Sequence, residues 1–296
     1  MSTADAPAGN AVTGLVRALR PRQWVKNVLV VAAPVAAGDV LQTDVITSVA
    51  VAFVAFCLAA SGVYLVNDVL DVEADRVHPT KRHRPIAAGV VAPATAVGVA
   101  VVLFAASLAV SLLASTDLVI LMAVYIGVQL GYCLGLKHQP VIDICIVASG
   151  FLMRATAGGV AAGIVLSQWF LLAAAFGSLF MVAGKRYAEI RLAERTGAKI
   201  RRSLERYSSS YLRFVWALSA TTLIMTYGLW AFEIREGSGS VWSVISMVPF
   251  VVAVLRYAVD VDGGNAGEPE DIALGDRVLQ VLAAAWVTAL LLAVYL

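Results

Sequence analysis

Long apolar stretches separated by short polar ones run along nearly the whole chain. A helix that crosses a bilayer needs roughly 17–25 largely apolar residues. Nine segments meet or approach this length, at 22–38, 44–66, 92–114, 118–136, 141–163, 169–183, 211–232, 241–257 and 278–296. No alternating pattern of the kind found in membrane β-barrels competes with them. The pattern therefore predicts an all-α, multi-pass membrane bundle of about nine helices. We expect residues 1–296 to form one integral-membrane domain whose first twenty residues are a cytoplasmic segment.

Composition supports the membrane assignment. The 296 residues are 60% hydrophobic and 14% charged, and the mean hydropathy is +0.83. Soluble domains carry about 25% charged residues, so a water-soluble enzyme is excluded. The net charge of +2 is too small for a nucleic-acid-binding protein, and no nucleic-acid partner is expected.

The positions of the basic residues predict the orientation. Of the 22 Lys and Arg residues, all but Arg154 and Arg235 fall on one side of the predicted bundle. Because basic loops stay in the cytoplasm, that side is predicted to be cytoplasmic. With an odd number of helices, the N-terminus then lies inside the cell and the C-terminus outside a plasma (inner) membrane. The long connections 67–91, 184–210 and 258–277 lie on the cytoplasmic side, where their length and polarity indicate function.

Acidic and amide side chains gather where the second apolar segment ends, in the sequence NDVLDVEAD at 67–75. If the helix continues, Asp68, Asp71 and Asp75 share one stripe, and so do Asn67, Asp71 and Asp75. Carboxylates on one stripe repel each other unless a cation lies among them. Oxygen ligands without Cys or His are typical of Mg²⁺, which substrate phosphates often complete. This spacing predicts a Mg²⁺ site, the alternative being a solvated helix end.

A basic cluster follows at once, RVHPTKRHRP at 76–85. Membrane anchoring alone would account for some of these charges. A basic cluster next to a metal-binding stripe is also what a diphosphate leaving group requires, because metal and arginine or lysine together neutralise its charge. The chain has no GxxxxGK[ST] loop, which disfavours nucleoside-triphosphate hydrolysis.

The N-D-x-x-D-x-x-x-D motif, at the end of the second helix of a nine-helix protein, resembles the UbiA superfamily of intramembrane prenyltransferases. Further segments resemble one branch of it, the decaprenyl-phosphate phosphoribosyltransferases: 19–27 (LRPRQWVKN), 67–89, 140–159 and 184–189 (GKRYAE). The resemblance covers nearly the whole chain. One departure is evident, because the aromatic prenyltransferases of the superfamily carry a second aspartate-rich motif after the sixth helix. Residues 184–191 contain one carboxylate and three bases there instead.

The resemblance implies a Mg²⁺-dependent transfer of 5-phosphoribose from 5-phosphoribosyl-1-diphosphate to polyprenyl (decaprenyl) phosphate, a precursor step for cell-wall arabinan. The implied catalytic residues are Asp68, Asp71, Lys26 and Arg82, and the implied metal ligands are Asn67, Asp68, Asp71 and Asp75. The implied substrate-binding residues are Lys26, Asn67, Lys81, Arg82, Arg84, Arg154, Lys185, Arg186, Tyr187 and Glu189. Asp143 and Arg154 are ionisable groups inside a predicted span and are functional candidates on that ground, with a structural pair as the alternative.

Two other functions stay open from sequence. An aromatic polyprenyltransferase of quinone-type lipid synthesis predicts the second aspartate cluster, which is missing here. A membrane transporter predicts internal repeats and polar residues at mid-membrane, whereas the polar residues here gather at one face. Prenyl chain length, the number of Mg²⁺ ions, a homo-oligomeric state, the lipid groove and the role of the segment 260–276 are not predicted.

Overall fold

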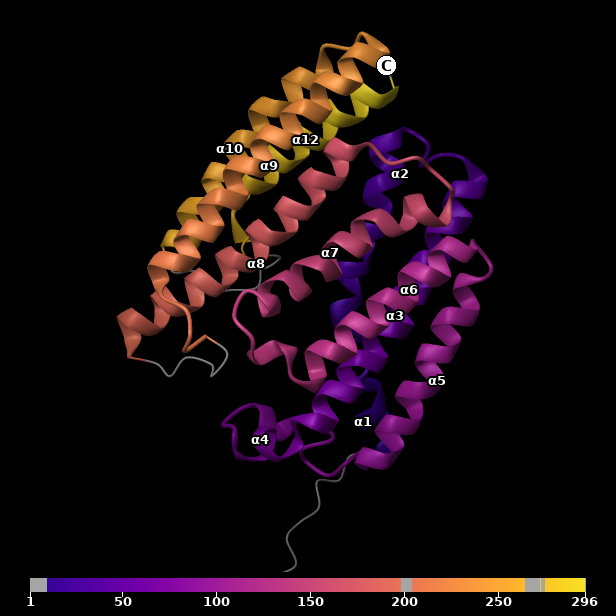
Figure 1. Ribbon diagram of the computed structural model, residues 1–296, viewed down its shortest axis with the longest axis vertical. Helices are drawn as coiled ribbons and strands as arrows, with labels where there is room; N and C mark the ends of the chain where they lie inside the picture. The colour runs from indigo at the N-terminus through magenta and orange to yellow at the C-terminus, as the bar shows by residue number, and fades with distance from the viewer. Residues whose placement is uncertain (1–9, 198–203, 264–271, 273–274, 296) are drawn as a thin grey trace, which may run out of the picture. The chain divides into compact units, whose positions relative to one another are not determined.

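The computed structural model describes residues 10–197, 204–263, 272 and 275–295, and no β-strand occurs among them (Figure 1). Two compact units make up the chain. The first contains residues 1–31, 43–136 and 157–163, and the second contains 32–42, 137–156 and 164–296. The prediction of a single domain stays a prediction.

Helices account for nearly all of the described chain. In order, they are α1 (Ala11–Ala18), the 3₁₀ helix η1 (Pro21–Val31), α2 (Ala32–Ala37), α3 (Thr43–Leu70), α4 (Val72–Val77), η2 (Lys81–His83), α5 (Pro93–Ser111), α6 (Thr116–Leu134), η3 (Leu136–His138), α7 (Ile142–Ala161), α8 (Gln168–Thr196), α9 (Ser209–Ser238), α10 (Trp242–Asp262) and α12 (Arg277–Tyr295).

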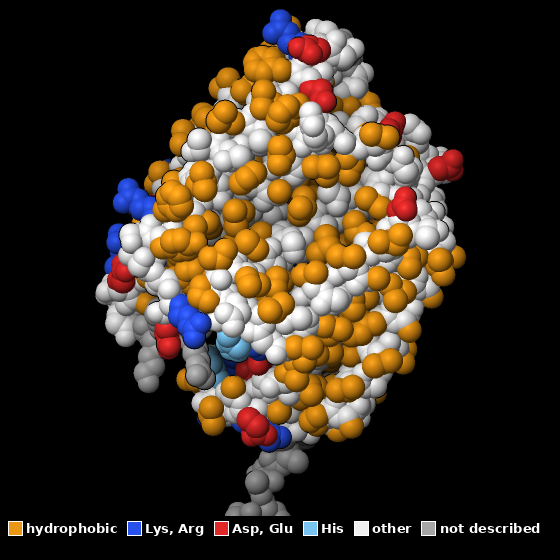
Figure 2. Space-filling view, in the orientation of Figure 1, with side chains coloured by type: hydrophobic (Ala, Val, Ile, Leu, Met, Phe, Trp, Pro, Cys, Tyr) orange, Lys and Arg blue, Asp and Glu red, His pale blue; other side chains and the backbone are white. Residues whose placement is uncertain are grey.

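Eight of the described helices are long and apolar enough to cross a bilayer, namely α3, α5, α6, α7, α8, α9, α10 and α12. Hydrophobic side chains cover much of the face shown in Figure 2, with few charged ones among them. Val101 and Val102 of α5 and Val248 of α10 are more than 60% exposed. Such contiguous apolar surface is stable against lipid but not against water. The prediction of an all-α membrane-embedded protein is confirmed, and its count of nine spans is approximate.

The first predicted span, 22–38, differs from the rest. It forms η1 followed by the six-residue α2, and neither is a long α-helix. Pro34 has no backbone N–H to donate within a helix, and the polar residues Arg22, Gln23, Lys26 and Asn27 weaken the apolar pattern. Asn27 is nevertheless buried and donates to Cys57 Sγ at 3.3 Å.

Two helices extend further than the apolar pattern predicted. α8 continues to Thr196 and α10 to Asp262, so the connections predicted to start at 184 and 258 start later. The extension of α8 is rich in Ala, Glu, Lys and Arg, which favour helix without needing apolar surroundings. It ends where Gly197 adopts a left-handed conformation with φ +69°, as helix C-termini commonly do. Residues 184–189 are therefore helical.

The first unit is built around α3, which packs against α1, η1, α5 and α6. Small side chains allow these close approaches, as is usual between membrane helices. A Cβ placed on Gly62 of α3 would lie 2.6 Å from Cε1 of Phe104 on α5. The core of this unit includes Ala18, Leu65 and Ile86. The segment that follows α4, which contains Ile86, therefore packs against α3 although the two are separated in sequence.

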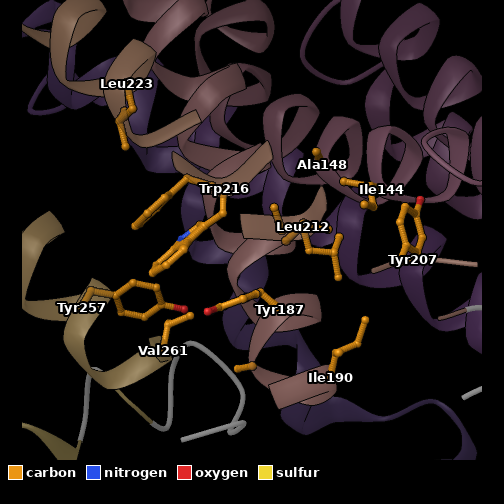
Figure 3. Packing of buried hydrophobic residues seen from close by; sticks show 14 of the residues in the cluster. Ile144, Ala148, Tyr187, Ile190, Tyr207, Leu212, Trp216, Leu223, Tyr257 and Val261 are labelled. Atoms are coloured by element: carbon orange, nitrogen blue, oxygen red, sulfur yellow. The ribbon is translucent and has the colours of Figure 1, made fainter. Parts of the chain in front are cut away.

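The second unit buries aromatic side chains between α8, α9 and α10 (Figure 3). The Trp216 ring stacks on Phe180 and on Tyr187, with centroid distances of 5.9 and 5.5 Å. Gly184 makes room for this indole, because a Cβ there would lie 2.9 Å from Trp216 Nε1. The aromatic cluster thus fixes the part of α8 that carries the predicted substrate-binding residues.

The contact between α3 and α5 predicts that Gly62→Leu destabilises the first unit. Overpacking costs about 1–3 kcal/mol, and the gain in helix propensity returns less than about 1 kcal/mol. The midpoint of thermal unfolding in detergent should therefore fall. Gly98→Leu on α5 is the matched control, because a Cβ at Gly98 meets nothing within 4 Å. Equal midpoints for the two variants would contradict this account of the packing.

Candidate functional site

The predicted acidic stripe lies at the junction of α3 and α4. The backbone N–H of Asp71 donates to Asn67 O at 3.0 Å, and that of Asp75 donates to Asp71 O at 2.8 Å. Helical hydrogen bonding thus passes through the junction and keeps the polar side chains in register. Asp68 and Asp75 are both 2% exposed. Two acidic side chains are thus buried, one at the end of the apolar helix α3 and one on α4.

One arginine bridges the two buried carboxylates. Arg84 Nη1 lies 2.7 Å from Asp75 Oδ2 and 3.1 Å from Asp68 Oδ1. Because a single nitrogen contacts both, the two carboxylates converge on one point, as the stripe predicted. Burying an unpaired charge is costly, so Arg84 stabilises the stripe in this conformation.

A second arginine, Arg20, also contacts the stripe and was not among the predicted site residues. Its Nη2 lies 2.6 Å from Asp68 Oδ1, and its guanidinium lies over the Tyr64 ring at 4.7 Å. Arg20 has φ +54°, a conformation that few non-glycine residues adopt. The sequence feature that could have identified Arg20 as a site residue is its position in the segment 19–27, which carries the family resemblance.

The other predicted residues of the first unit differ in exposure. Arg82 is exposed and Lys81 is half-buried in η2, where Arg82 Nε lies 3.4 Å from His83 Nε2. Lys26 is half-buried in η1, and Asn67 Oδ1 is 3.9 Å from Cys133 Sγ. Of the predicted basic cluster, Arg84 is the member whose contact with the acidic stripe is established.

The acidic stripe offers suitable chemistry for Mg²⁺. In the described part of the chain, no three His, Cys, Asp or Glu side chains are grouped closely enough to hold a metal ion. Mg²⁺ commonly uses only one or two carboxylates and completes its shell with water and substrate phosphates. Asp68 and Asp75 already converge on a cationic nitrogen, and each has a second oxygen. The donor set therefore fits Mg²⁺, and the four predicted ligands stay a prediction.

In the second unit, Asp143 at the start of α7 connects two predicted or candidate groups. Asp143 is 1% exposed, and its Oδ2 lies 3.5 Å from Arg186 Nη2 of α8. Its Oδ1 accepts a hydrogen bond from the Tyr207 hydroxyl at 2.5 Å. Burial and this hydrogen bond raise the pKa of Tyr207, so the phenol keeps its proton further into the alkaline range than an ordinary tyrosine does. Tyr207 was missed because it lies in a polar connection without a motif.

The predicted site residues next to Arg186 on α8 have surroundings different from those of Arg186. The Tyr187 hydroxyl donates to Asp262 Oδ1 at 2.8 Å, and Figure 3 shows its hydroxyl end directed toward that of Tyr257. Lys185 and Glu189 are half-buried and lie one helical turn apart, on the same side of α8. Asp262, which was predicted only as part of a polar connection, is thus a contact of a predicted binding residue.

Arg154 lies within α7 and is 8% exposed. Its Nη1 donates to Gly150 O at 2.9 Å, and its guanidinium lies 5.9 Å from the centre of the Phe151 ring. Both contacts are within its own helix and satisfy part of the buried charge. These contacts do not test the predicted role of Arg154 in substrate binding, which stays a prediction.

The profile of the UbiA prenyltransferase family matches residues 28–274, most of the chain. The chain belongs to this family. Among curated relatives, a decaprenyl-phosphate phosphoribosyltransferase of Mycobacterium tuberculosis is 65% identical, with 95% of this chain and 94% of the relative covered. Proteins of the same name from Mycolicibacterium smegmatis and Corynebacterium glutamicum are 62% and 59% identical, covering 98% of this chain and 95% and 89% of theirs. The resemblance recognised from the sequence motifs is confirmed.

Solved structures support the fold. A UbiA homologue from Archaeoglobus fulgidus bound to GPP and Mg²⁺ has a TM-score of 0.71 at 14% identity, with 96% of this chain and all of that chain covered. A digeranylgeranylglyceryl phosphate synthase has a TM-score of 0.67 at 14% identity, with 97% and 100% covered. At this identity the likeness concerns the arrangement of helices alone.

The bridge between Arg84 and the acidic stripe predicts that Arg84→Ala destabilises the first unit. The variant leaves Asp68 and Asp75 without a shared cation, which should lower the free energy of unfolding by about 1–3 kcal/mol. Thermal unfolding in detergent, with the exposed Arg22→Ala as control, measures this. An unfolding midpoint equal to that of the control would show that Arg84 does not stabilise the stripe.

The raised pKa of Tyr207 predicts an unusual titration. A free tyrosine titrates near pH ~10, and Tyr207 should titrate above that value. A group whose pKa is higher in the folded than in the unfolded state stabilises the fold. This stabilisation is fully present at a pH below the unfolded-state pKa, and it is lost as the pH rises through the folded-state pKa. The ultraviolet absorbance of phenolate, compared between wild type and Tyr207→Phe, measures the titration. If the titration that is lost in Tyr207→Phe has a pKa at or below that of a free tyrosine, the burial and hydrogen bonding of Tyr207 are contradicted.

Proposed function

We propose that this protein transfers the 5-phosphoribosyl group from 5-phosphoribosyl-1-diphosphate to polyprenyl (decaprenyl) phosphate and releases diphosphate. The observation that carries the proposal is the identity of 59–65%, over nearly the whole chain, with relatives named decaprenyl-phosphate phosphoribosyltransferase. In this reaction the bond from ribose C1 to the diphosphate oxygen breaks, and a bond from C1 to an oxygen of the lipid phosphate forms. The product would serve cell-wall arabinan synthesis.

The acidic stripe supports a magnesium-dependent reaction. Asn67, Asp68, Asp71 and Asp75 would hold Mg²⁺, as suggested by the donor chemistry and by two Mg²⁺-bound structures of a UbiA homologue from Archaeoglobus fulgidus. The metal would supply positive charge to the departing diphosphate. Lys81, Arg82 and Arg84 would neutralise the remaining charge as it develops, because guanidinium and ammonium groups bind phosphate oxygens strongly.

The second unit carries further groups suited to phosphate. Lys185, Arg186 and Tyr187 would bind a substrate monophosphate, and Glu189 would orient one of these bases. In the first unit, Lys26 is also proposed to bind phosphate. C1 would become oxocarbenium-like as the leaving group departs, as in glycosyl transfer generally. The attacking lipid phosphate is already anionic at neutral pH, so the mechanism needs no general base.

Membrane placement follows from charge. The basic side of the chain would face the cytoplasm, where a soluble sugar diphosphate is supplied, and the membrane would be the plasma membrane. The stretch formed by η1 and α2 has a contour of about 30 Å at the rise of 3₁₀ and α helices. A ninth crossing there would put the C-terminus outside the cell.

The test is formation of a labelled lipid from radiolabelled phosphoribosyl diphosphate and decaprenyl phosphate in detergent. Wild type should make this lipid only with Mg²⁺. Asp71→Ala should lower the rate by about 100-fold or more, as loss of a charge-stabilising group usually does. Glu73→Ala is the matched control, because Glu73 lies on the same segment, is 80% exposed in its side chain and pairs with Arg76.

Two outcomes would contradict the proposal. Absence of any labelled lipid from folded wild type would exclude the phosphoribosyl transfer, and a prenylated phenol formed from an aromatic acceptor would favour the aromatic polyprenyltransferase. Full activity in folded Asp71→Ala would exclude the acidic stripe as the metal site.

A further inference from the structure

The Tyr207 hydroxyl joins three parts of the second unit. It accepts a hydrogen bond from the backbone N–H of Val141 at 2.5 Å and donates one to Asp143 Oδ1 at 2.5 Å. The other oxygen of Asp143 faces Arg186 on α8. A residue between α8 and α9 is thereby connected, through a single carboxylate, to an arginine proposed to bind phosphate.

Burial makes these contacts important. Asp143 is 1% exposed, and Tyr207 and Arg186 are each 8% exposed. A carboxylate removed from water requires partners, and Tyr207 supplies a hydrogen bond to Oδ1. Oδ2 has no hydrogen-bond partner in the described part of the chain, although it lies 3.5 Å from Arg186 Nη2. The ion pair between Asp143 and Arg186 is therefore loose.

The loose pair has a chemical consequence. A carboxylate that is free to turn binds a guanidinium through both oxygens, which is the strong, bidentate arrangement. Here the Tyr207 hydroxyl holds Oδ1 of Asp143, so only Oδ2 faces Arg186. The guanidinium has five N–H donors in a rigid fork, and in the observed orientation the carboxylate presents Oδ2 to it at 3.5 Å instead of both oxygens at short distance.

We propose that Tyr207 is a positioning residue for substrate binding. By holding Asp143 back from Arg186, it keeps the guanidinium able to receive a phosphate group of the sugar substrate. The inference rests on the proposed function and extends it to a residue that does not itself touch the substrate. Val141 supports this role, because a β-branched residue with φ +70° is strained and its N–H is held by the same hydroxyl.

Removal of the hydroxyl should weaken substrate binding and leave the chemical step unchanged. In Tyr207→Phe, Asp143 would turn its carboxylate onto Arg186 and compete with the phosphate. We expect the KM for phosphoribosyl diphosphate to rise about tenfold, the effect of weakening one hydrogen bond to a charged group, and kcat to change by less than about twofold.

The matched control is Tyr211→Phe. This variant loses the same phenolic oxygen, and the Tyr211 ring stacks on that of Tyr207 with the ring centroids 5.8 Å apart. Tyr211 is 38% exposed and does not take part in the described contacts with Asp143. Its KM should equal that of wild type. A merely structural role of Tyr207 would lower the amount of active enzyme and the unfolding temperature, but it would not raise KM selectively.

A second variant tests the route through Asp143. Asp143→Asn keeps the volume of the side chain and an acceptor for Tyr207 but removes the charge that competes for Arg186. Added to Tyr207→Phe, it should return the KM toward the wild-type value. As a single substitution, Asp143→Asn should give a KM equal to or lower than that of wild type. This measurement tests the proposal even if Tyr207→Phe does not fold.

The outcomes separate this inference from the proposed function. A folded wild type that makes no labelled lipid contradicts the proposed function, and the inference with it. An active wild type whose KM is the same in Tyr207→Phe and Tyr211→Phe overturns the inference alone. So does a KM that rises in Asp143→Asn, because the carboxylate would then assist binding.

Discussion

The neutralisation of two buried carboxylates by Arg84 is the contact on which the candidate site depends. Asp68 lies at the end of α3, the longest helix of the first unit, and Asp75 lies on α4, each 2% exposed. Without a cation between them, their desolvation and mutual repulsion would destabilise the fold. Arg84 reaches both from beyond α4. Sequence reasoning treated acidic stripe and basic cluster as adjacent features, whereas in the fold they form one ion-paired group.

The same constraint applies in the second unit with a different solution. Asp143 is also buried beside an arginine, but a tyrosine hydroxyl takes the short contact and the ion pair is long. The two ion-paired groups differ in their balance of charge. Arg84 contacts two carboxylates, whereas Arg186 contacts the single carboxylate of Asp143. The Arg84 guanidinium lies 2.7 and 3.1 Å from its two carboxylates, whereas the Arg186 guanidinium lies 3.5 Å from a single carboxylate oxygen.

The membrane spans could be predicted because length and apolarity alone decide which helices are stable in lipid. The stripe could be predicted because the spacing of Asp68, Asp71 and Asp75 follows helical geometry. The η1 segment and the full length of α8 could not, because proline and helix propensity there oppose the apolar pattern. Tyr207 could not either, since a contact sixty-four residues from Asp143 leaves no local periodic signal.

The only two non-glycine residues with positive φ in the described part of the chain are Arg20 and Val141. Each such residue costs of order 1–3 kcal/mol, comparable with a hydrogen bond to a charged group. Arg20 contacts Asp68 directly, and Val141 reaches Asp143 through Tyr207. Backbone strain in each unit therefore occurs where a buried carboxylate is held in place.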